Sequence, residues 1–205
     1  MKNSLESFEV NQLIGASSPI VALKDKIISL AELDVPVYIQ GDAGTGKNLI
    51  ASLIAGKGIL QIDCANFSSD WNLLIQQYAN KTSKSLHIRA ESIKVTAPLY
   101  FDKLEFLDTE GQAILFRILD NQEFVTAKKE RVDFSSRIFL SSNKHLPQMV
   151  KDGLFRKDLF QKINLICLHT VNLRDVKSDL PLLVNYFVTE FKTKYKKILL
   201  VSPRS

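Results

Sequence analysis

The segment from Gly41 to Lys47 constrains the fold of this chain more than any other feature. It reads Gly-Asp-Ala-Gly-Thr-Gly-Lys and matches the first seven positions of the Walker A pattern. An apolar, β-prone run at 35–39 leads into it, and a segment of helical character follows at 48–55. In this arrangement, successive backbone N–H groups and a helix N-terminus converge on phosphate oxygens. We therefore expect a phosphate-binding loop; the alternative is an ordinary strand-to-helix turn.

Two side chains at the end of this loop bear on its chemistry. Lys47 is expected to reach the β- and γ-phosphates as a point charge. The strict pattern continues with Ser or Thr, whose hydroxyl ligates magnesium, but here Asn48 follows. The residues predicted to bind the cofactor are Gly41, Asp42, Ala43, Gly44, Thr45, Gly46, Lys47 and Asn48.

Outside the loop, apolar β-prone runs alternate with amphipathic segments, which is typical of βαβ units in a mainly parallel sheet. The fold class is therefore predicted to be α/β. Further strands are expected at 59–62, 98–101, 137–140 and 165–168, and a hairpin at 124–134. Helices are expected at 18–30, 71–78, 109–119 and 180–191, while residues 80–96 are too weakly patterned for a prediction.

Composition narrows the class of protein. Of 205 residues, 45% are hydrophobic and 24% charged, which is enough for a packed core. No apolar run approaches the ~18 residues that span a bilayer, and the first residues do not resemble a signal peptide, so we expect a cytoplasmic protein. Cys64 and Cys167 lie in apolar runs and are expected to be buried, reduced thiols.

The net charge of +5 owes much to lysines near the C-terminus, at 192, 194, 196 and 197. A solvated helix face is the interpretation we favour over a nucleic-acid patch, because no DNA-binding motif accompanies these lysines.

Several segments resemble, in the same order, the AAA+ domain of sigma-54-dependent transcription activators. The phosphate loop resembles the family's G-E-x-G-T-G-K. The other matching segments, with the family pattern after each, are Asp63-Cys64-Ala65 (N-C-A), Leu99-Tyr100-Phe101-Asp102-Lys103-Leu104 (L-F-L-D-E-I), Ser141-Ser142-Asn143 (A-T-N) and Gly153-Leu154-Phe155-Arg156-Lys157-Asp158-Leu159 (G-x-F-R-x-D-L). The resemblance covers roughly residues 11–192.

This resemblance implies a P-loop AAA+ core over 1–172, with helices flanking the sheet, and the start of a truncated helical lid with a basic tail over 173–205. It implies ATP or ADP with Mg²⁺ as cofactors, and AAA+ relatives as partners in a homo- or hetero-oligomer. Asp102 takes the place of the Walker B aspartate that ligates magnesium, and Asn143 that of the sensor I asparagine. Arg156 resembles the finger that reaches a neighbouring subunit's γ-phosphate; the alternative is a structural surface arginine.

The chain also departs from the family at positions that carry its chemistry. Lys103 stands where the family has the glutamate that polarises the attacking water, a loss expected to slow hydrolysis by about 10²–10⁴-fold. The partner asparagine of that glutamate is Asp63 here. We predict that Asp63 and Lys103 form an ion pair; the alternative is independent drift, with Lys103 extended into solvent. Lys162 replaces a second arginine.

Three further segments of the family, including the loop that grips sigma-54, are also missing. The G-A-F-T-G-A loop should fall within 79–96, where the sequence reads otherwise. The sensor II segment G-N-V-R-E-L and a helix-turn-helix are not found either. Contact with sigma-54 is therefore not expected.

Three functions follow as hypotheses. The first is a nucleotide-binding domain of a bacterial transcription regulator in which hydrolysis and sigma-54 engagement are lost. The second is an active ATPase in which Asp42, Glu105 or Asp108 replaces the missing glutamate; Glu105 lies two positions past Lys103, on the same side of an extended strand. The third is a fragment or interaction module with no chemistry of its own.

Overall fold

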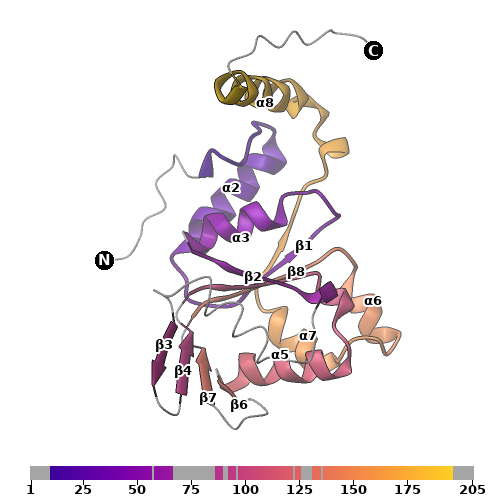
Figure 1. The fold of residues 1–205 in the computed structure, drawn as a ribbon. Coiled ribbons are helices and arrows are strands. Elements are labelled where there is room, and N and C mark those ends of the chain that lie inside the picture. Colours follow the sequence, from indigo (N-terminus) through magenta and orange to yellow (C-terminus); the bar gives the residue numbers. More distant parts are fainter. Residues whose placement is uncertain are drawn as a thin grey trace.

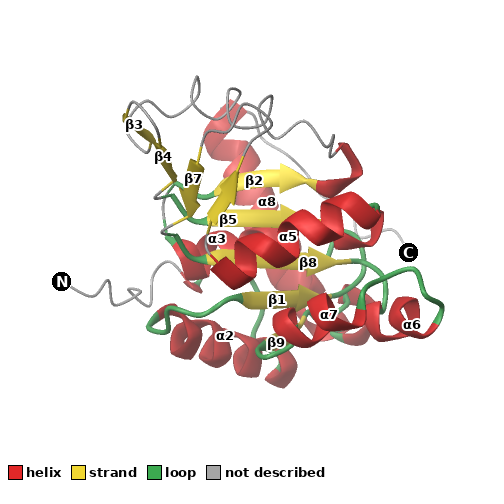
Figure 2. Ribbon diagram, turned by 90° about the horizontal axis from the view of Figure 1, so that it is seen from below, coloured by secondary structure: helices red, strands yellow, loops and turns green. Residues whose placement is uncertain are grey.

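A computed structural model describes residues 10–56, 58–66, 86–89, 92–95, 97–121, 123–125, 131–134 and 136–195. Its centre is a five-stranded parallel sheet in the order β2-β5-β8-β1-β9 (Figures 1 and 2). The strands are β1 (Val37–Gln40), β2 (Leu60–Asp63), β5 (Leu99–Asp102), β8 (Ile138–Ser142) and β9 (Cys167–His169). The predicted α/β class and parallel sheet are confirmed.

Helices cover both faces of this sheet. Figure 1 shows α2 (Ser18–Ala31) and α3 (Lys47–Ala55) on one face, and α5 (Thr109–Asn121) and α7 (Lys157–Ile163) on the other. Short α6 (Leu146–Lys151) precedes α7, and α8 (Leu180–Tyr195) lies beyond α2. Neither α6 nor α7 was predicted, because six or seven residues are too few to show helical periodicity.

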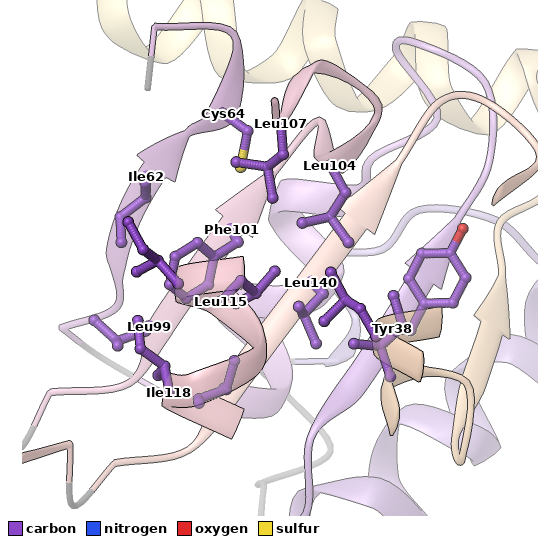
Figure 3. Packing of buried hydrophobic residues seen from close by; sticks show 14 of the residues in the cluster. Tyr38, Ile62, Cys64, Leu99, Phe101, Leu104, Leu107, Leu115, Ile118 and Leu140 are labelled. Carbon is purple, nitrogen blue, oxygen red and sulfur yellow. The ribbon is translucent and has the colours of Figure 1, made fainter. Parts of the chain in front are cut away.

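Strand alternation divides the core into two layers. On β1, Val37 and Ile39 point to the side of α2 and α3, whereas Tyr38 points to the side of α5 and α7. Figure 3 shows the second layer, in which Leu115 and Ile118 of α5 pack on Phe101 and other strand residues. All of these side chains are essentially inaccessible to solvent. The sheet is therefore a rigid platform whose strand ends can hold a site.

A second, four-stranded sheet lies beside the first in the order β3-β4-β7-β6 (Figure 1). It comprises β3 (Leu86–Arg89), β4 (Ser92–Val95), β6 (Glu123–Val125) and β7 (Arg131–Phe134). The antiparallel pair β6–β7 confirms the predicted hairpin. The β3–β4 pair was not predicted: Leu86–Arg89 and Ser92–Val95 do alternate apolar and polar residues, but each run has only four residues, and β4 pairs with the distant β7. The expected helix at 71–78 lies outside the described residues.

The structure also bears on the expected last strand, the two cysteines and the lysines near the C-terminus. The last strand begins at Cys167, not at Leu165, whose side chain is exposed. Cys64 is buried and unpaired as expected, but Cys167 is unpaired and only half-buried. Lys192 and Lys194 lie in the last turn of α8, on the exposed side of the fold. Within the described part of the chain, the helices are all too short or too polar to span a membrane.

One buried carboxylate ties the start of α8 to the start of α2. Asp179 accepts hydrogen bonds from the backbone N–H groups of Ala16 and Ser17, both at 3.0 Å, and from the Ser17 hydroxyl at 2.5 Å. Gly15 has φ of +145°, and a Cβ there would lie 2.8 Å from the Asp179 carboxylate. Only glycine fits this approach. Asp179 thus fixes where α8 leaves the core.

We predict that Asp179→Asn lowers the Tm by several degrees at pH 7, because the amide keeps one acceptor oxygen and loses the charge. The Ser17 hydroxyl and the Ala16 amide lower the pKa of Asp179 in the folded chain. The stabilisation is therefore complete above about pH 4 and is lost as the pH falls from there through the folded-state pKa. Thermal unfolding at pH 7 and pH 3 checks this; a Tm difference from wild type that is equal at both values would contradict it.

Candidate functional site

The phosphate loop has a conformation that its glycines permit. Gly44 and Gly46 have φ of +80° and +84°, values that side chains rarely adopt. A Cβ on Gly41 would lie 1.7 Å from the Thr170 hydroxyl oxygen, so this position also requires glycine. The Thr45 hydroxyl donates to the Asp42 carbonyl at 2.8 Å and accepts from Thr170 at 2.7 Å. The loop is thus fixed at the start of α3 and beside the end of β9.

Lys47 is the first residue of α3, and its ammonium is held inside the loop. The side chain is only 6% exposed. Its Nζ donates to the carbonyl oxygens of Gly41 and Asp42, both at 2.8 Å, and to Asn143 Oδ1 at 2.6 Å. Burial lowers the pKa of Lys47, while the carboxylates of Asp102, Glu105 and Asp42 act in the opposite direction. An ammonium has three donors, and oxygens accept from all of them here.

A cavity of about 650 Å³ opens beside this loop. Its lining includes loop residues 43–46 and Leu183, Tyr186 and Phe187 of α8. Segments 12–14 and 171–174 also contribute to the lining, with further residues from α2, α3 and α8. The volume falls within the roughly 300–1,000 Å³ usual for ligand pockets. The cavity is therefore bounded both by the phosphate loop and by apolar and aromatic side chains.

Asp102 ends β5 next to the loop, and three side chains that were not predicted surround it. Its Oδ1 accepts from the Ser141 hydroxyl at 2.5 Å and lies 3.1 Å from the Tyr100 hydroxyl. Burial raises the pKa of Tyr100, which keeps this hydroxyl protonated. On the other side, Gln61 links Asn48 at 3.0 Å to Asp102 Oδ2 at 3.5 Å. Within the described ranges, no group of three or more His, Cys, Asp or Glu side chains is placed to hold a metal ion.

Lys103 and Asp63 form the predicted ion pair, with 2.8 Å between Nζ and Oδ2. Burial raises the pKa of Asp63, but hydrogen bonds from Lys103 and from the Ala65 amide outweigh it and hold the pKa below its usual value. Lys103 has φ of +63°, the one positive value found for a non-glycine among the described residues. Its ammonium is directed to Asp63, so the alternative in which Lys103 extends into solvent is wrong.

Asn143, at the end of β8, connects Lys47 to Glu105. Its side-chain Nδ2 donates to Glu105 Oε1 at 2.7 Å, and its backbone N–H lies 3.2 Å from both carboxylate oxygens. Of the three proposed substitute carboxylates, Glu105 alone makes such a contact. Asp42 pairs with Arg174 at 3.1 Å, and Asp108 accepts from the Gly111 amide at 2.7 Å, at the start of α5.

Arg156 is not brought together with the phosphate loop within this chain. It precedes α7, where its guanidinium binds Asp158 at 2.6 Å and lies 5.4 Å from the centre of the Phe116 ring. Lys162 pairs with Asp120 and also lies over Phe116. Both cations therefore have structural partners on the α5 side of the sheet.

The fold and the site together define a P-loop α/β domain of the AAA+ class. The family model described as "Sigma-54 interaction domain" matches residues 14–173, and the chain belongs to this family.

Characterised relatives are longer proteins. The chain is 26% identical to the Nif-specific regulatory protein of Bradyrhizobium diazoefficiens, covering 92% of this chain and 34% of that protein. It is 29% identical to the response regulator protein PilR of Pseudomonas aeruginosa, covering 84% of this chain and 41% of that protein. The chain thus spans well under half the length of either relative.

Solved structures agree on the fold. NtrX from Brucella abortus, in a crystal structure described as a complex with ATP, superposes with a TM-score of 0.76 at 22% identity. The match covers 93% of this chain and 44% of NtrX. At this identity the likeness concerns the fold alone.

We predict that Lys103→Glu lowers the Tm, because it places a second carboxylate beside Asp63. Adding Asp63→Asn should restore most of the loss, since an amide can donate to the new carboxylate. Differential scanning fluorimetry of the wild type, both single variants and the double variant tests this coupling. Additive shifts in the double variant would show that the pair contributes nothing beyond its separate residues.

Proposed function

We propose that this domain binds ATP or ADP in the phosphate loop and acts by binding within a bacterial transcription regulator, with hydrolysis weak or lost and sigma-54 engagement lost. One observation carries the proposal. The buried Lys47 ammonium sits among three acceptor oxygens, and the loop residues 43–46 just before it line a cavity of about 650 Å³. A phosphate is the ligand whose oxygens can replace those acceptors.

The geometry supports a nucleotide in one orientation. Residues 43–47 would hold the phosphates through backbone N–H groups and Lys47, while Tyr186 and Phe187 would face the base. The open space at Gly44 and Gly46 lets phosphate approach the backbone closely. Magnesium usually takes one or two carboxylates together with phosphate oxygens and waters. Asp102 fits that role as the single carboxylate, whereas Asn48 supplies no hydroxyl and contacts Gln61.

The ion pair supports weak hydrolysis. A protonated lysine cannot accept a proton from the attacking water, and Asp63 raises the pKa of Lys103 further. The position next to Asp102 therefore provides no base. The family sequence that engages sigma-54 is missing from 79–96, which supports a role without that contact.

The domain limits and the oligomer remain part of this proposal. Residues 1–172 would form the nucleotide-binding core, and 173–205 the start of the lid and a basic tail. In an assembly with AAA+ relatives, Arg156 would leave Asp158 and act on a neighbouring subunit's nucleotide.

A second candidate function is an active ATPase that uses Glu105. The observation that favours it is the 2.7 Å contact between Glu105 and Asn143, which brings a carboxylate to the phosphate end of the site. In that case Glu105→Gln would abolish turnover.

We predict that Lys47→Ala weakens ATP and ADP binding by about 10- to 100-fold, the cost of one charge-assisted hydrogen bond. Isothermal titration calorimetry with and without Mg²⁺ measures this. The matched control is Lys24→Ala, which removes a lysine that contacts the Gly15 carbonyl outside the phosphate loop. Equal affinity in the wild type and Lys47→Ala would contradict nucleotide binding at this loop.

For hydrolysis, we predict that phosphate release by the wild type is about 10²–10⁴-fold slower than that of the Asp63→Asn/Lys103→Glu variant, in which the missing base returns. A coupled phosphate assay at saturating ATP compares the two proteins. Wild-type turnover equal to that of the double variant, and lost in Glu105→Gln, would establish the second candidate instead.

A further inference from the structure

The amide of Asn143 has an orientation that its two partners dictate. Lys47 can only donate hydrogen bonds and an ionised carboxylate can only accept them. Asn143 therefore presents Oδ1 to Lys47 at 2.6 Å and Nδ2 to Glu105 at 2.7 Å. Rotating the amide by half a turn would place two donors against each other and an oxygen against a carboxylate. This orientation follows from chemistry and not from a choice between similar atoms.

Glu105 holds Asn143 through more than one bond. Both of its oxygens also lie 3.2 Å from the Asn143 backbone N–H. The carboxylate follows β5 in the 3₁₀ turn Leu104–Phe106, next to the end of β8 where Asn143 lies. The side chain of Asn143 thus cannot turn its N–H groups toward the loop without leaving Glu105.

This orientation matters for the phosphate farthest from the base. Asn143 Oδ1 lies within one hydrogen bond of the Lys47 ammonium, the group expected to reach the β- and γ-phosphates. An oxygen at that place competes with a terminal phosphate for the hydrogen bonds of Lys47. It also donates no hydrogen bond to that phosphate. The charges of Asp102 and Glu105 act on the same ammonium. The nearby Lys103 is paired with Asp63 and does not offset them.

The α- and β-phosphates would lie beside a different set of groups. Backbone N–H groups of the loop and the N-terminus of α3 face them, and these donors do not depend on Asn143. The site therefore favours two phosphates more than it favours a third.

We infer that Glu105 is a specificity-determining residue: by fixing Asn143 with its amide oxygen toward Lys47, it makes the site select nucleoside diphosphates over triphosphates. The inference rests on the proposed nucleotide binding. Glu105 acts here as a positioning residue, through Asn143 and through its charge, and takes no part in a chemical step.

The test compares the affinities for ADP and ATP, measured by calorimetry without Mg²⁺, in the wild type and two variants. Glu105→Gln removes the charge and lets Asn143 rotate, since glutamine can donate to its oxygen. Glu110→Gln is the matched control, because it removes the same charge from an exposed side chain at the start of α5. Thermal unfolding of each protein confirms that it is folded.

We expect the wild type to bind ADP at least about tenfold more tightly than ATP. Glu105→Gln should reduce this ratio to less than about threefold, through tighter ATP binding at nearly constant ADP affinity. Glu110→Gln should leave the ratio unchanged. A wild type that binds both nucleotides equally, or a ratio that persists in Glu105→Gln, would overturn the inference while leaving nucleotide binding intact. Binding of neither nucleotide would overturn the proposed function and this inference together.

Discussion

The burial of the Lys47 ammonium is the constraint on which the rest of the site depends. A cation that is 6% exposed needs an acceptor for each of its donors, and the oxygens of Gly41, Asp42 and Asn143 supply them. Two of these oxygens belong to the loop backbone, so the lysine also shapes the loop that surrounds it. The third oxygen, from Asn143, links the end of β8 to the loop that follows β1. The ends of two central strands of the sheet therefore contribute to one site.

Around this lysine, the charged and polar side chains at the strand ends are engaged in contacts with one another. Lys103 and Asp63 form an ion pair at the ends of β5 and β2. Glu105 receives three N–H contacts from Asn143. The Ser141 and Tyr100 hydroxyls surround Asp102. Each of these side chains has a partner in the structure, and these contacts are the ones on which our proposal of weak or lost hydrolysis rests.

Much of this could be predicted from sequence where local pattern and chemistry coincide. The loop from Gly41 to Lys47, with a strand before it and a helix after it, fixed the fold class and the candidate phosphate site. The Asp63–Lys103 pair was predictable because the charges of two family positions change together on neighbouring strands.

The remaining features depend on contacts between distant segments. The 92–95 segment alternates polar and apolar residues over only four positions, and in the structure it pairs with the distant β7. The roles of Gln61 beside Asp102 and of Asp179 beside Ser17 have no motif, because each is defined by a partner far along the chain. Glu105 was one of three candidate carboxylates, and only the position of Asn143 distinguishes it from Asp42 and Asp108.

A crystal structure of the domain with ADP would show whether Lys47 and the loop hold a phosphate. We expect a β-phosphate oxygen within hydrogen-bonding distance of Lys47 Nζ and of backbone amides in 43–47, with the base against α8. A nucleotide bound elsewhere, with Lys47 still bonded to Gly41, Asp42 and Asn143, would contradict this expectation.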